Sequence, residues 1–446
     1  MSDMTKLLRD LSIEKLQQLV RQSKNYKKSA NEGIIKKYDR NMENKYPLSY
    51  AQQRLWIINQ YNPSSAAYNI ATVVTIEGVF SIQALEYSLN EILQRHESLR
   101  TSFINSDGKV YQTIATKCKI EMPIIDIRNL SSNEVDSEWR KIMAQEISQP
   151  FDLQVPPLLR VMLVQFEENK YKLLFTMHHI ISDGWSLGVL IKEMNRYYEA
   201  FVSGKHHEMS ELAIQYLDFS LWQKNYLQGS VYEEQLSYWK KNLQGKLPVL
   251  QLPTNRPRPL VQSFRGERLY FEIPRDLVNK IKKLISTEEI TLFMALLSAY
   301  ATLLYRYSLQ KDILIGTSIA NRNKKEWEAL IGFFVNTLVI RCDLSKQPTF
   351  KELFSRVRET CLGAFANQDF PFEKIVEELH VEREASYQPV VQTYFSLQNV
   401  QEINLKMKNL TMEMKELDTK TSKFDISLTL RESNDLLIGE FEYSTD

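Results

Sequence analysis

Apolar residues recur at helical spacing in several stretches of the chain. Between residues 82 and 93 they line one face, and Ser81 stands where an N-cap residue belongs. A second amphipathic helix is expected over residues 187–201. Residues 277–307 are mostly helical in pattern, and residues 350–366 repeat the amphipathic spacing. The pattern therefore predicts long helices in both halves of the chain.

Short apolar runs predict strands between these helices. Asp107-Gly108 joins two strand-like runs within residues 99–114, which is a good hairpin signal. A second hairpin is expected to turn near residues 167–170. The remaining expected strands cover residues 161–166, 171–179, 312–320, 333–344, 425–433 and 436–444. This mixture of helices and strands predicts an α+β fold.

The chain divides into a leader and two lobes of similar size. Residues 1–45 combine a short amphipathic helix, whose apolar positions lie between residues 7 and 20, with a basic linker that holds eight Lys or Arg against three acidic residues. This leader is a possible docking element for an upstream protein, or an ordinary lead-in that packs on the first lobe. We expect an N-terminal lobe over residues 46–215 and a C-terminal lobe over residues 216–446.

Charge and composition exclude several classes of protein. Lys and Arg number 56 and Asp and Glu number 55 in 446 residues, so the formal charge of +1 disfavours a nucleic-acid binder. The most apolar stretch, residues 291–304, is shorter than the roughly 20 residues that a membrane span needs. The three cysteines have no zinc-ligand spacing and fit a reduced compartment. We therefore expect a cytoplasmic protein that binds neither nucleic acid nor membrane.

The strongest chemical motif is the run His178-His179-Ile180-Ile181-Ser182-Asp183-Gly184, which follows a strand and precedes a helix. Adjacent residues of an extended segment point to opposite faces, so one metal ion could not easily bind both imidazoles. Two interpretations then remain: a buried structural pair of histidines, or one imidazole in a cleft as a base or proton carrier. The second pair, His206-His207, lacks a following Asp-Gly and is expected to be exposed and inert.

This motif resembles the HHxxxDG signature of condensation domains from nonribosomal peptide synthetases. Further segments resemble the other motifs of that family, in the family's order: residues 49–56 (SYAQQRLW), 95–103 (RHESLRTSF), 216–222 (YLDFSLW), 331–337 (IGFFVNT) with Arg341, and 367–373 (NQDFPFE). The seventh motif is looser: Arg383, Ser386, Gln388 and Pro389 are present, but Glu384 and Tyr387 depart from the family pattern. The residues of the motifs resemble those of the subtype that joins an L-configured donor to an L-amino acid.

The resemblance implies a fold and a set of partners. The expected fold is a pseudodimer of two lobes similar to chloramphenicol acetyltransferase, arranged as a V with an active-site tunnel between them. Donor and acceptor peptidyl carrier proteins would bring substrates tethered through 4′-phosphopantetheine, and no cofactor would be bound by the chain itself. An adjacent adenylation domain is the implied neighbour, and an upstream synthetase subunit could bind the N-terminal helix.

The resemblance also implies roles for single residues. His179 would be the catalytic histidine, with His178 in support, and Gly184 could form a tight turn that aims a backbone N–H at the developing oxyanion. Asp183 is interpreted as a structural anion, and Arg322 is its candidate partner. The family positions near the tunnel are Arg100 and Asn336, for which packing and substrate contact both remain open. Trp185 and Ser186 are expected to start the following helix, with Ser186 as a possible cap.

Other functions of the same superfamily compete with condensation. An epimerisation domain shares HHxxxDG, and a free-standing acyltransferase shares part of it. A non-catalytic scaffold that only binds carrier proteins is the alternative outside enzymes, but such a domain should have lost His179 or Asp183, and both are present.

Overall fold

The structure is a computed structural model, and it describes residues 35–40, 44–204, 209–382, 384–398, 406–407, 410–433 and 436–446. Three features singled out in the sequence lie outside these ranges: the helix expected over residues 7–20, the pair His206-His207, and Arg383.

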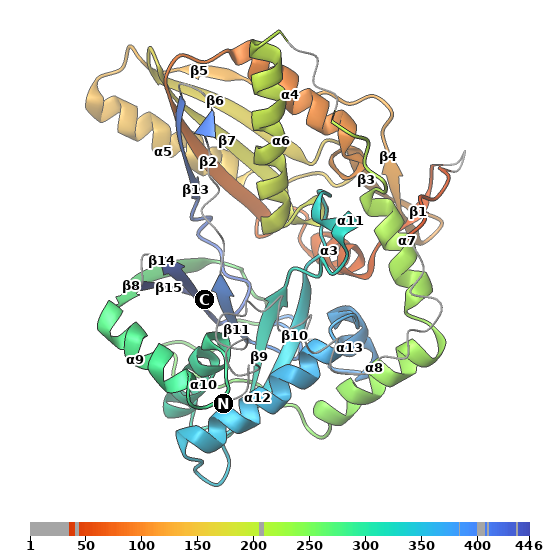
Figure 1. The fold of residues 1–446 in the computed structure, drawn as a ribbon, viewed down its shortest axis with the longest axis vertical. Helices are drawn as coiled ribbons and strands as arrows, with labels where there is room; N and C mark the ends of the chain where they lie inside the picture. Colours follow the sequence, from red (N-terminus) through yellow and green to blue (C-terminus); the bar gives the residue numbers. More distant parts are fainter. Residues whose placement is uncertain are drawn as a thin grey trace.

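Two lobes are visible in Figure 1, each built on a six-stranded mixed sheet. The first half of the described chain consists of β1 (Tyr46–Pro47), α3 (Tyr50–Tyr61), β2 (Asn69–Glu77), α4 (Ile82–Arg95), η2 (Glu97–Arg100), β3 (Thr101–Ser106), β4 (Lys109–Ile114), β5 (Ile124–Asp126), α5 (Ser132–Ser148), β6 (Leu159–Glu167), β7 (Lys170–His178), η3 (His179–Ile181) and α6 (Gly184–Val202).

The second half continues with α7 (Tyr216–Tyr226), α8 (Gly229–Asn242), β8 (Gly266–Ile273), α9 (Arg275–Ile285), α10 (Leu292–Ser308), β9 (Asp312–Ile319), α11 (Lys325–Glu328), β10 (Asn336–Asp343), α12 (Phe350–Ala366), α13 (Phe372–Glu378), β11 (Thr393–Gln398), β12 (Lys406–Met407), β13 (Leu410–Glu416), β14 (Ile426–Ser433) and β15 (Leu436–Ser444). The predicted α+β class is confirmed.

Local sequence signals account for many of these boundaries. Ser81 caps α4 by accepting a hydrogen bond from the backbone N–H of Ala84 at 3.1 Å. The hairpin predicted at Asp107-Gly108 is confirmed, because β3 and β4 pair up to Ser106 and Lys109. Asp107 and Gly108 both have positive φ, which a two-residue hairpin turn of this kind requires.

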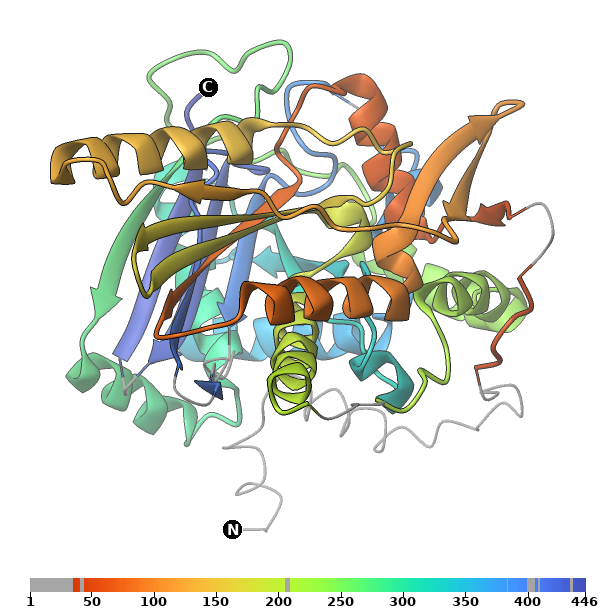
Figure 2. The same ribbon diagram turned by 90° about the horizontal axis from the view of Figure 1, so that it is seen from above.

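The sheet of the N-terminal lobe has the strand order β12-β13-β2-β7-β6-β5 and is covered on both faces. Helix α5 lies on one face and helices α4 and α6 lie together on the other (Figure 2). Alternation along the strands produces two cores, because Val73 packs with Trp139 of α5 while its neighbour Val74 joins the core that contains α4 and α6.

The sheet of the C-terminal lobe has the order β10-β9-β11-β14-β15-β8. Helices α10 and α12 pack against each other and on its strands β9 and β10, and α9 packs on β15 (Figure 1). The apolar stretch at residues 291–304 forms α10, with Leu297 and Tyr300 fully buried. Of the helices in the described ranges, none is both long enough and apolar enough to cross a membrane.

The second half of the chain contributes two strands, β12 and β13, to the sheet of the N-terminal lobe. Strand β13 belongs to the half expected to form the C-terminal lobe, yet it pairs with β2 of the N-terminal lobe from Thr411 opposite Glu77 to Glu416 opposite Thr72. The chain then returns through residues 417–425 to β14, which Figure 1 shows in the other lobe. No local pattern predicts this pairing, because the partner strand lies more than 300 residues away and β13 alternates apolar with polar residues.

Candidate active site

The two histidines of the motif lie where a strand ends. His178 is the last residue of β7, and His179 opens the short helix η3. The backbone N–H of His178 donates to the carbonyl of Leu158 at 3.0 Å, whereas that of His179 donates to the carbonyl of Tyr68 at 2.8 Å. Both backbones are therefore held by neighbouring segments of the same lobe.

His178 is a buried, neutral residue. Its Nδ1 accepts a hydrogen bond from the N–H of Ile180 at 3.1 Å, and its ring meets the ring of Phe151 with 6.1 Å between centroids. Burial, with smaller contributions from the charges of His179 and Lys423, lowers the pKa of His178 to about 3. These contacts favour a structural role, in support of its neighbour.

His179 points to different surroundings and holds a defined tautomer. Its Nδ1 lies 2.8 Å from the carbonyl oxygen of Ser182, which can only accept, so the hydrogen of the neutral ring sits on Nδ1. This tautomer leaves the lone pair on Nε2. The ring of Phe333, from the second half of the chain, lies against the imidazole with 4.7 Å between centroids and 60° between planes.

The electrostatic environment keeps His179 neutral. Burial is the largest cause, the charge of Lys423 acts in the same direction, and together they lower the pKa of His179 to about 4. The Ser182 carbonyl and the charge of Asp183 oppose this shift. His179 is therefore an uncharged hydrogen-bond acceptor near neutral pH.

Asp183 makes several buried contacts at the start of α6. It is 1% exposed and forms the N-cap of α6, with Oδ1 accepting from the backbone N–H of Ser186 at 2.9 Å. Its Oδ2 accepts from the backbone N–H of Phe334 at 3.1 Å. The ion pair predicted with Arg322 is present, at 3.0 Å between Nη2 and Oδ1. These contacts hold the carboxylate in one place at the start of α6.

Arg322 reaches this carboxylate from the second half of the chain. Its side chain is 1% exposed, and its Nη1 also donates to the carbonyls of Trp327 at 2.5 Å and Leu330 at 2.7 Å. The guanidinium lies over the ring of Phe334 at 4.1 Å from the centroid. The pair therefore joins the two halves of the chain in the protein interior.

The expectation that Ser186 caps the following helix is wrong. Helix α6 begins at Gly184, and its cap is Asp183 rather than Ser186, because an extended Asp183 can return its carboxylate to the N–H of Ser186. Gly184 does not make a strained turn, since its φ is outside the left-handed region and an added Cβ would meet nothing within 4 Å. Trp185 lies partly exposed in the first turn, and its Nε1 donates to the carbonyl of Glu328 at 2.9 Å.

Arg100 and Asn336 make contacts with backbone groups. The guanidinium of Arg100 donates to the carbonyls of Leu93 and Gln94 at the end of α4 and to that of Ala115. The amide nitrogen of Asn336 donates to the carbonyls of Gln368 and Phe370, at 2.8 and 2.9 Å. Of the two roles that the sequence left open, these contacts favour packing.

Two residues near the histidines, Phe333 and Lys423, were not singled out from the sequence as parts of the site. Lys423 lies in the segment that returns from β13 to β14, and its Nζ is 5.0 Å from the ring centroid of Tyr68. Burial lowers the pKa of Lys423, as do the charges of Arg54 and Arg268, whereas nearby glutamates raise it. The local sequence around Lys423 does not indicate this position. Lys423 reaches Tyr68 because the chain returns from β13, in the N-terminal lobe, to β14.

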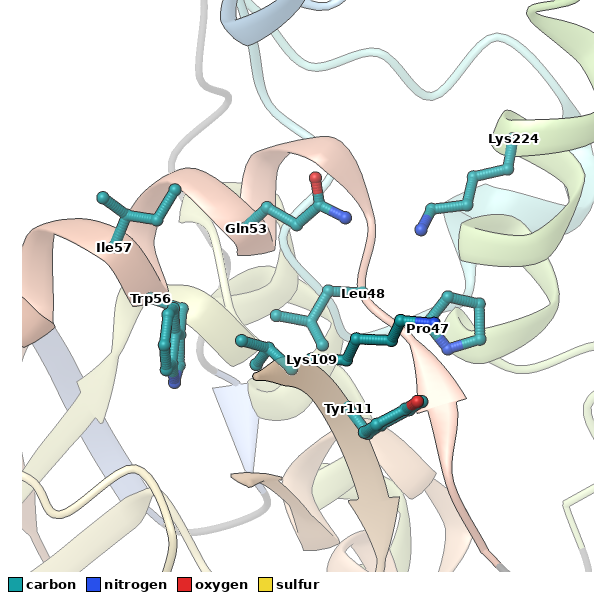
Figure 3. Close-up of a pocket in the computed structure, with 9 residues that line it drawn as sticks. Pro47, Leu48, Gln53, Trp56, Ile57, Lys109, Tyr111 and Lys224 are labelled. Atoms are coloured by element: carbon teal, nitrogen blue, oxygen red, sulfur yellow. The ribbon is translucent and has the colours of Figure 1, made fainter. Parts of the chain in front are cut away.

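The site has no obvious place for a metal ion. Throughout the part of the chain that the structure describes, no three His, Cys, Asp or Glu side chains gather as ligands. A surface pocket of about 380 Å³ lies elsewhere, between α3, β4 and α7 (Figure 3). Trp56, Tyr111 and Lys224 are among its lining residues, which include no residue of the histidine motif.

The family profile described as "Condensation domain" matches residues 42–446. The chain is 47% identical to a linear gramicidin synthase of Brevibacillus parabrevis over 402 residues, which cover 90% of this chain and 8% of the relative. It is 39% identical to surfactin synthase subunit 1 of Bacillus subtilis (strain 168), over 90% of this chain and 11% of the relative. The chain thus spans about a tenth of the length of these relatives.

Solved structures share the fold at lower identity. The X-domain from teicoplanin biosynthesis superposes with a TM-score of 0.85 at 24% identity, covering 93% of this chain and 92% of that one. The first condensation domain of the calcium-dependent antibiotic synthetase gives 0.74 at 17% identity, covering 91% and 92%.

Removing one partner of the buried ion pair should destabilise the protein strongly. We expect Asp183→Ala to lower the free energy of unfolding by about 3–5 kcal/mol, because Arg322 would keep a buried, uncompensated charge. The double variant Asp183→Ala/Arg322→Met should lose less than the sum of the two single changes. Urea denaturation measures all of these values.

The matched control is Asp126→Ala. Asp126 forms an ion pair of 2.7 Å with Arg128, but both side chains are more than 40% exposed. This variant should change stability far less. An equal loss of unfolding free energy in Asp183→Ala and Asp126→Ala would contradict the prediction that burial makes the loss of Asp183 costly.

The buried His178 should make stability depend on pH. Its pKa of about 3 in the folded protein lies below the ordinary value of about 6.5, so the unfolded chain binds the extra proton as the pH falls. Proton uptake by His178 in the unfolded chain should lower the free energy of unfolding by about 2 kcal/mol when the pH falls from 7 to 5. Urea denaturation at both pH values should give a smaller loss for His178→Asn than for the wild type.

Glu373 and Glu440, whose pKa values burial raises, act in the opposite direction in both proteins and cancel in this comparison. The exposed His380 supplies the control variant His380→Asn, which should retain the wild-type slope. An identical slope in the wild type and His178→Asn would refute the prediction.

Proposed function

The chain belongs to the condensation-domain family, and from this premise we propose that it joins two carrier-bound substrates by an amide bond. The single observation that carries the proposal is the state of His179, whose Nδ1–H is bound to the Ser182 carbonyl so that Nε2 remains an acceptor. An acceptor nitrogen of this kind suits a reaction in which an amine must be held with its lone pair toward a carbonyl carbon.

The proposed reaction is an aminolysis of a thioester. The amine nitrogen of the acceptor forms a bond to the thioester carbonyl carbon of the donor, and a tetrahedral intermediate collapses with loss of the carbon–sulfur bond. The sulfur of the donor's phosphopantetheine arm leaves as a thiolate. It takes up the proton that the amine nitrogen loses, directly or through solvent, and becomes a thiol. Because the thioester is already an activated acyl group, no acyl-enzyme intermediate is needed.

His179 acts in this scheme chiefly by orienting the amine. A free α-amino group has a pKa of about 7.7–8.0, so supplying its neutral form at pH 7 costs only about 1–1.4 kcal/mol. Correct orientation of two reactants contributes roughly 7–11 kcal/mol. A histidine whose pKa is about 4 is too weak a base to keep the amine's proton, but it can accept a hydrogen bond from the amine.

Gly184 is the proposed donor toward the developing oxyanion. Its N–H belongs to the first turn of α6, where backbone N–H groups lack partners within the helix. The absence of a side chain at a position with open space leaves that N–H approachable. Asp183 and Arg322 hold the start of this helix and support the reaction indirectly.

The partners follow from the family. We infer that donor and acceptor peptidyl carrier proteins present their phosphopantetheine arms between an N-terminal lobe over residues 46–215 and a C-terminal lobe over residues 216–446, of which β12 and β13 join the sheet of the first lobe. An adenylation domain is a further proposed neighbour, and an upstream synthetase subunit is another, through the helix expected over residues 7–20.

Replacing His179 tests the proposed reaction. We expect His179→Gln to lower the rate of amide formation at least about 100-fold, because the aligned acceptor is lost. Intact-mass measurement of the loaded acceptor carrier, after mixing with a loaded donor carrier, detects the product. His380→Asn is the matched control and should retain the wild-type rate, with both melting temperatures unchanged.

The outcomes of this assay separate the competing functions. Near-normal dipeptide formation by His179→Gln would contradict the assignment. A change of stereochemistry without condensation would mean epimerisation, and carrier binding without any product would mean a scaffold.

The dependence of the rate on pH tests the neutrality of His179. Since this histidine stays neutral above about pH 5, the rate should follow deprotonation of the acceptor amine and rise through pH 6–8. Single-turnover transfer at a series of pH values measures this profile. An inflection near pH 6.5 that disappears in His179→Gln would show instead that the imidazole titrates in its ordinary range.

A further inference from the structure

Residues 331–334, here called the strap, connect α11 to β10 and lie on the N-terminal lobe. Side chains of that lobe bind the backbone at both ends of the strap: the hydroxyl of Ser98 donates to the carbonyl of Ile331 at 2.7 Å, and the N–H of Phe334 donates to Asp183 at 3.1 Å. The strap is therefore fixed on a lobe to which it does not belong in sequence.

Tyr216 holds the middle of the strap. Its hydroxyl donates to the carbonyl of Phe333 at 2.6 Å, and the N–H of Gly332 donates to the hydroxyl of Ser186 at 3.0 Å. The ring of Tyr216 passes so close to Gly332 that an added Cβ would lie 2.0 Å from a ring atom. The ring of Tyr216 thus limits how closely the strap packs against it, and no larger residue fits at position 332.

The two phenylalanines of the strap have different surroundings. Phe334 is 1% exposed and packs against the guanidinium of Arg322 and the ring of Tyr216. Phe333 is only partly buried, and its ring lies 4.7 Å from the imidazole of His179 between centroids. The side chains of these two neighbours thus point to different surroundings, with Phe334 fixed in the core and the ring of Phe333 against the histidine.

We propose that Phe333 is a positioning residue for the reaction: its ring and the Ser182 carbonyl together hold the imidazole of His179 so that Nε2 faces the reacting amine. The hydrogen bond at Nδ1 fixes one edge of the imidazole, and the ring of Phe333 limits rotation about the remaining side-chain torsion. The kinetic part of this inference rests on the proposed function, whereas the contact itself does not.

The charges that face His179 allow the effect of Phe333 to be measured. They come from Asp183 at the start of α6 and from Lys423 in the return segment, and the neighbouring His178 is buried and neutral. Neither charge is removed when Phe333 is shortened. Water that enters the vacated space would hydrate the imidazole, so the pKa of His179 should rise from about 4 toward the ordinary 6.5.

The test compares Phe333→Ala, Phe333→Leu and the control Phe80→Ala. Phe80 also makes an edge contact, to the ring of Tyr171, with 4.6 Å between ring centroids. Tyr171, however, lies at the opposite end of β7 from His178. Two readouts are used: kcat and KM for transfer between loaded carriers, and titration of His179 by NMR in protein with isotope-labelled histidine. His179→Gln assigns the resonance.

We expect Phe333→Ala to lower kcat about 10- to 100-fold with KM changed far less, and to shift the His179 titration upward. Phe333→Leu keeps an apolar wall and should restore most of kcat, and Phe80→Ala should behave as the wild type. Unchanged kcat and titration in Phe333→Ala would overturn the proposal, as would a loss of kcat that only follows a lower melting temperature. If the wild type transfers no acyl group, the proposed function fails, and the NMR titration still decides whether Phe333 sets the state of His179.

Discussion

The buried ion pair between Asp183 and Arg322 holds the site together. It brings together the first turn of α6, which follows the histidine motif, and the segment that leads from β9 to the strap. Hydrogen bonds offset much of the cost of taking these two charges out of water, because the carboxylate also binds Ser186 and the N–H of Phe334 and the guanidinium binds two carbonyls through Nη1. The Nε of Arg322 is buried without a hydrogen-bond partner. The same carboxylate therefore starts the helix, holds the strap and joins the two halves.

The second constraint is the neutrality of His179. Burial and the nearby Lys423 disfavour the imidazolium, and the bond to Ser182 selects the tautomer. A histidine in this state orients a substrate better than it stores a proton. The arrangement agrees with the energetics of the proposed aminolysis, in which the neutral amine costs little to supply and its alignment contributes more.

Contacts between sequence-distant segments build the surroundings of His179. The strap places Phe333 against His179. The segment that leads from β13 to β14 carries Lys423, whose Nζ lies over the ring of Tyr68. Each segment is held on the N-terminal lobe by hydrogen bonds or strand pairing rather than by apolar contact alone. Segments from the second half of the chain that lie on the N-terminal lobe thus complete the surroundings of His179.

Local sequence patterns were sufficient to predict most secondary structure, the α+β class and the family, because these depend on periodicity, caps and linear motifs. The ion pair predicted between Asp183 and Arg322 is also present. The hairpin at Asp107-Gly108 and the helix at residues 350–366 were predicted with the boundaries that the structure has, within a residue or two. Only the folded chain established that Asp183 rather than Ser186 caps α6, that Arg100 and Asn336 bind backbone carbonyls, and that Phe333 and Lys423 flank the histidine. The physical reason is that these outcomes depend on contacts between residues distant along the chain, or on which of several equivalent donors finds a buried acceptor. No local pattern of apolar and polar residues records such contacts.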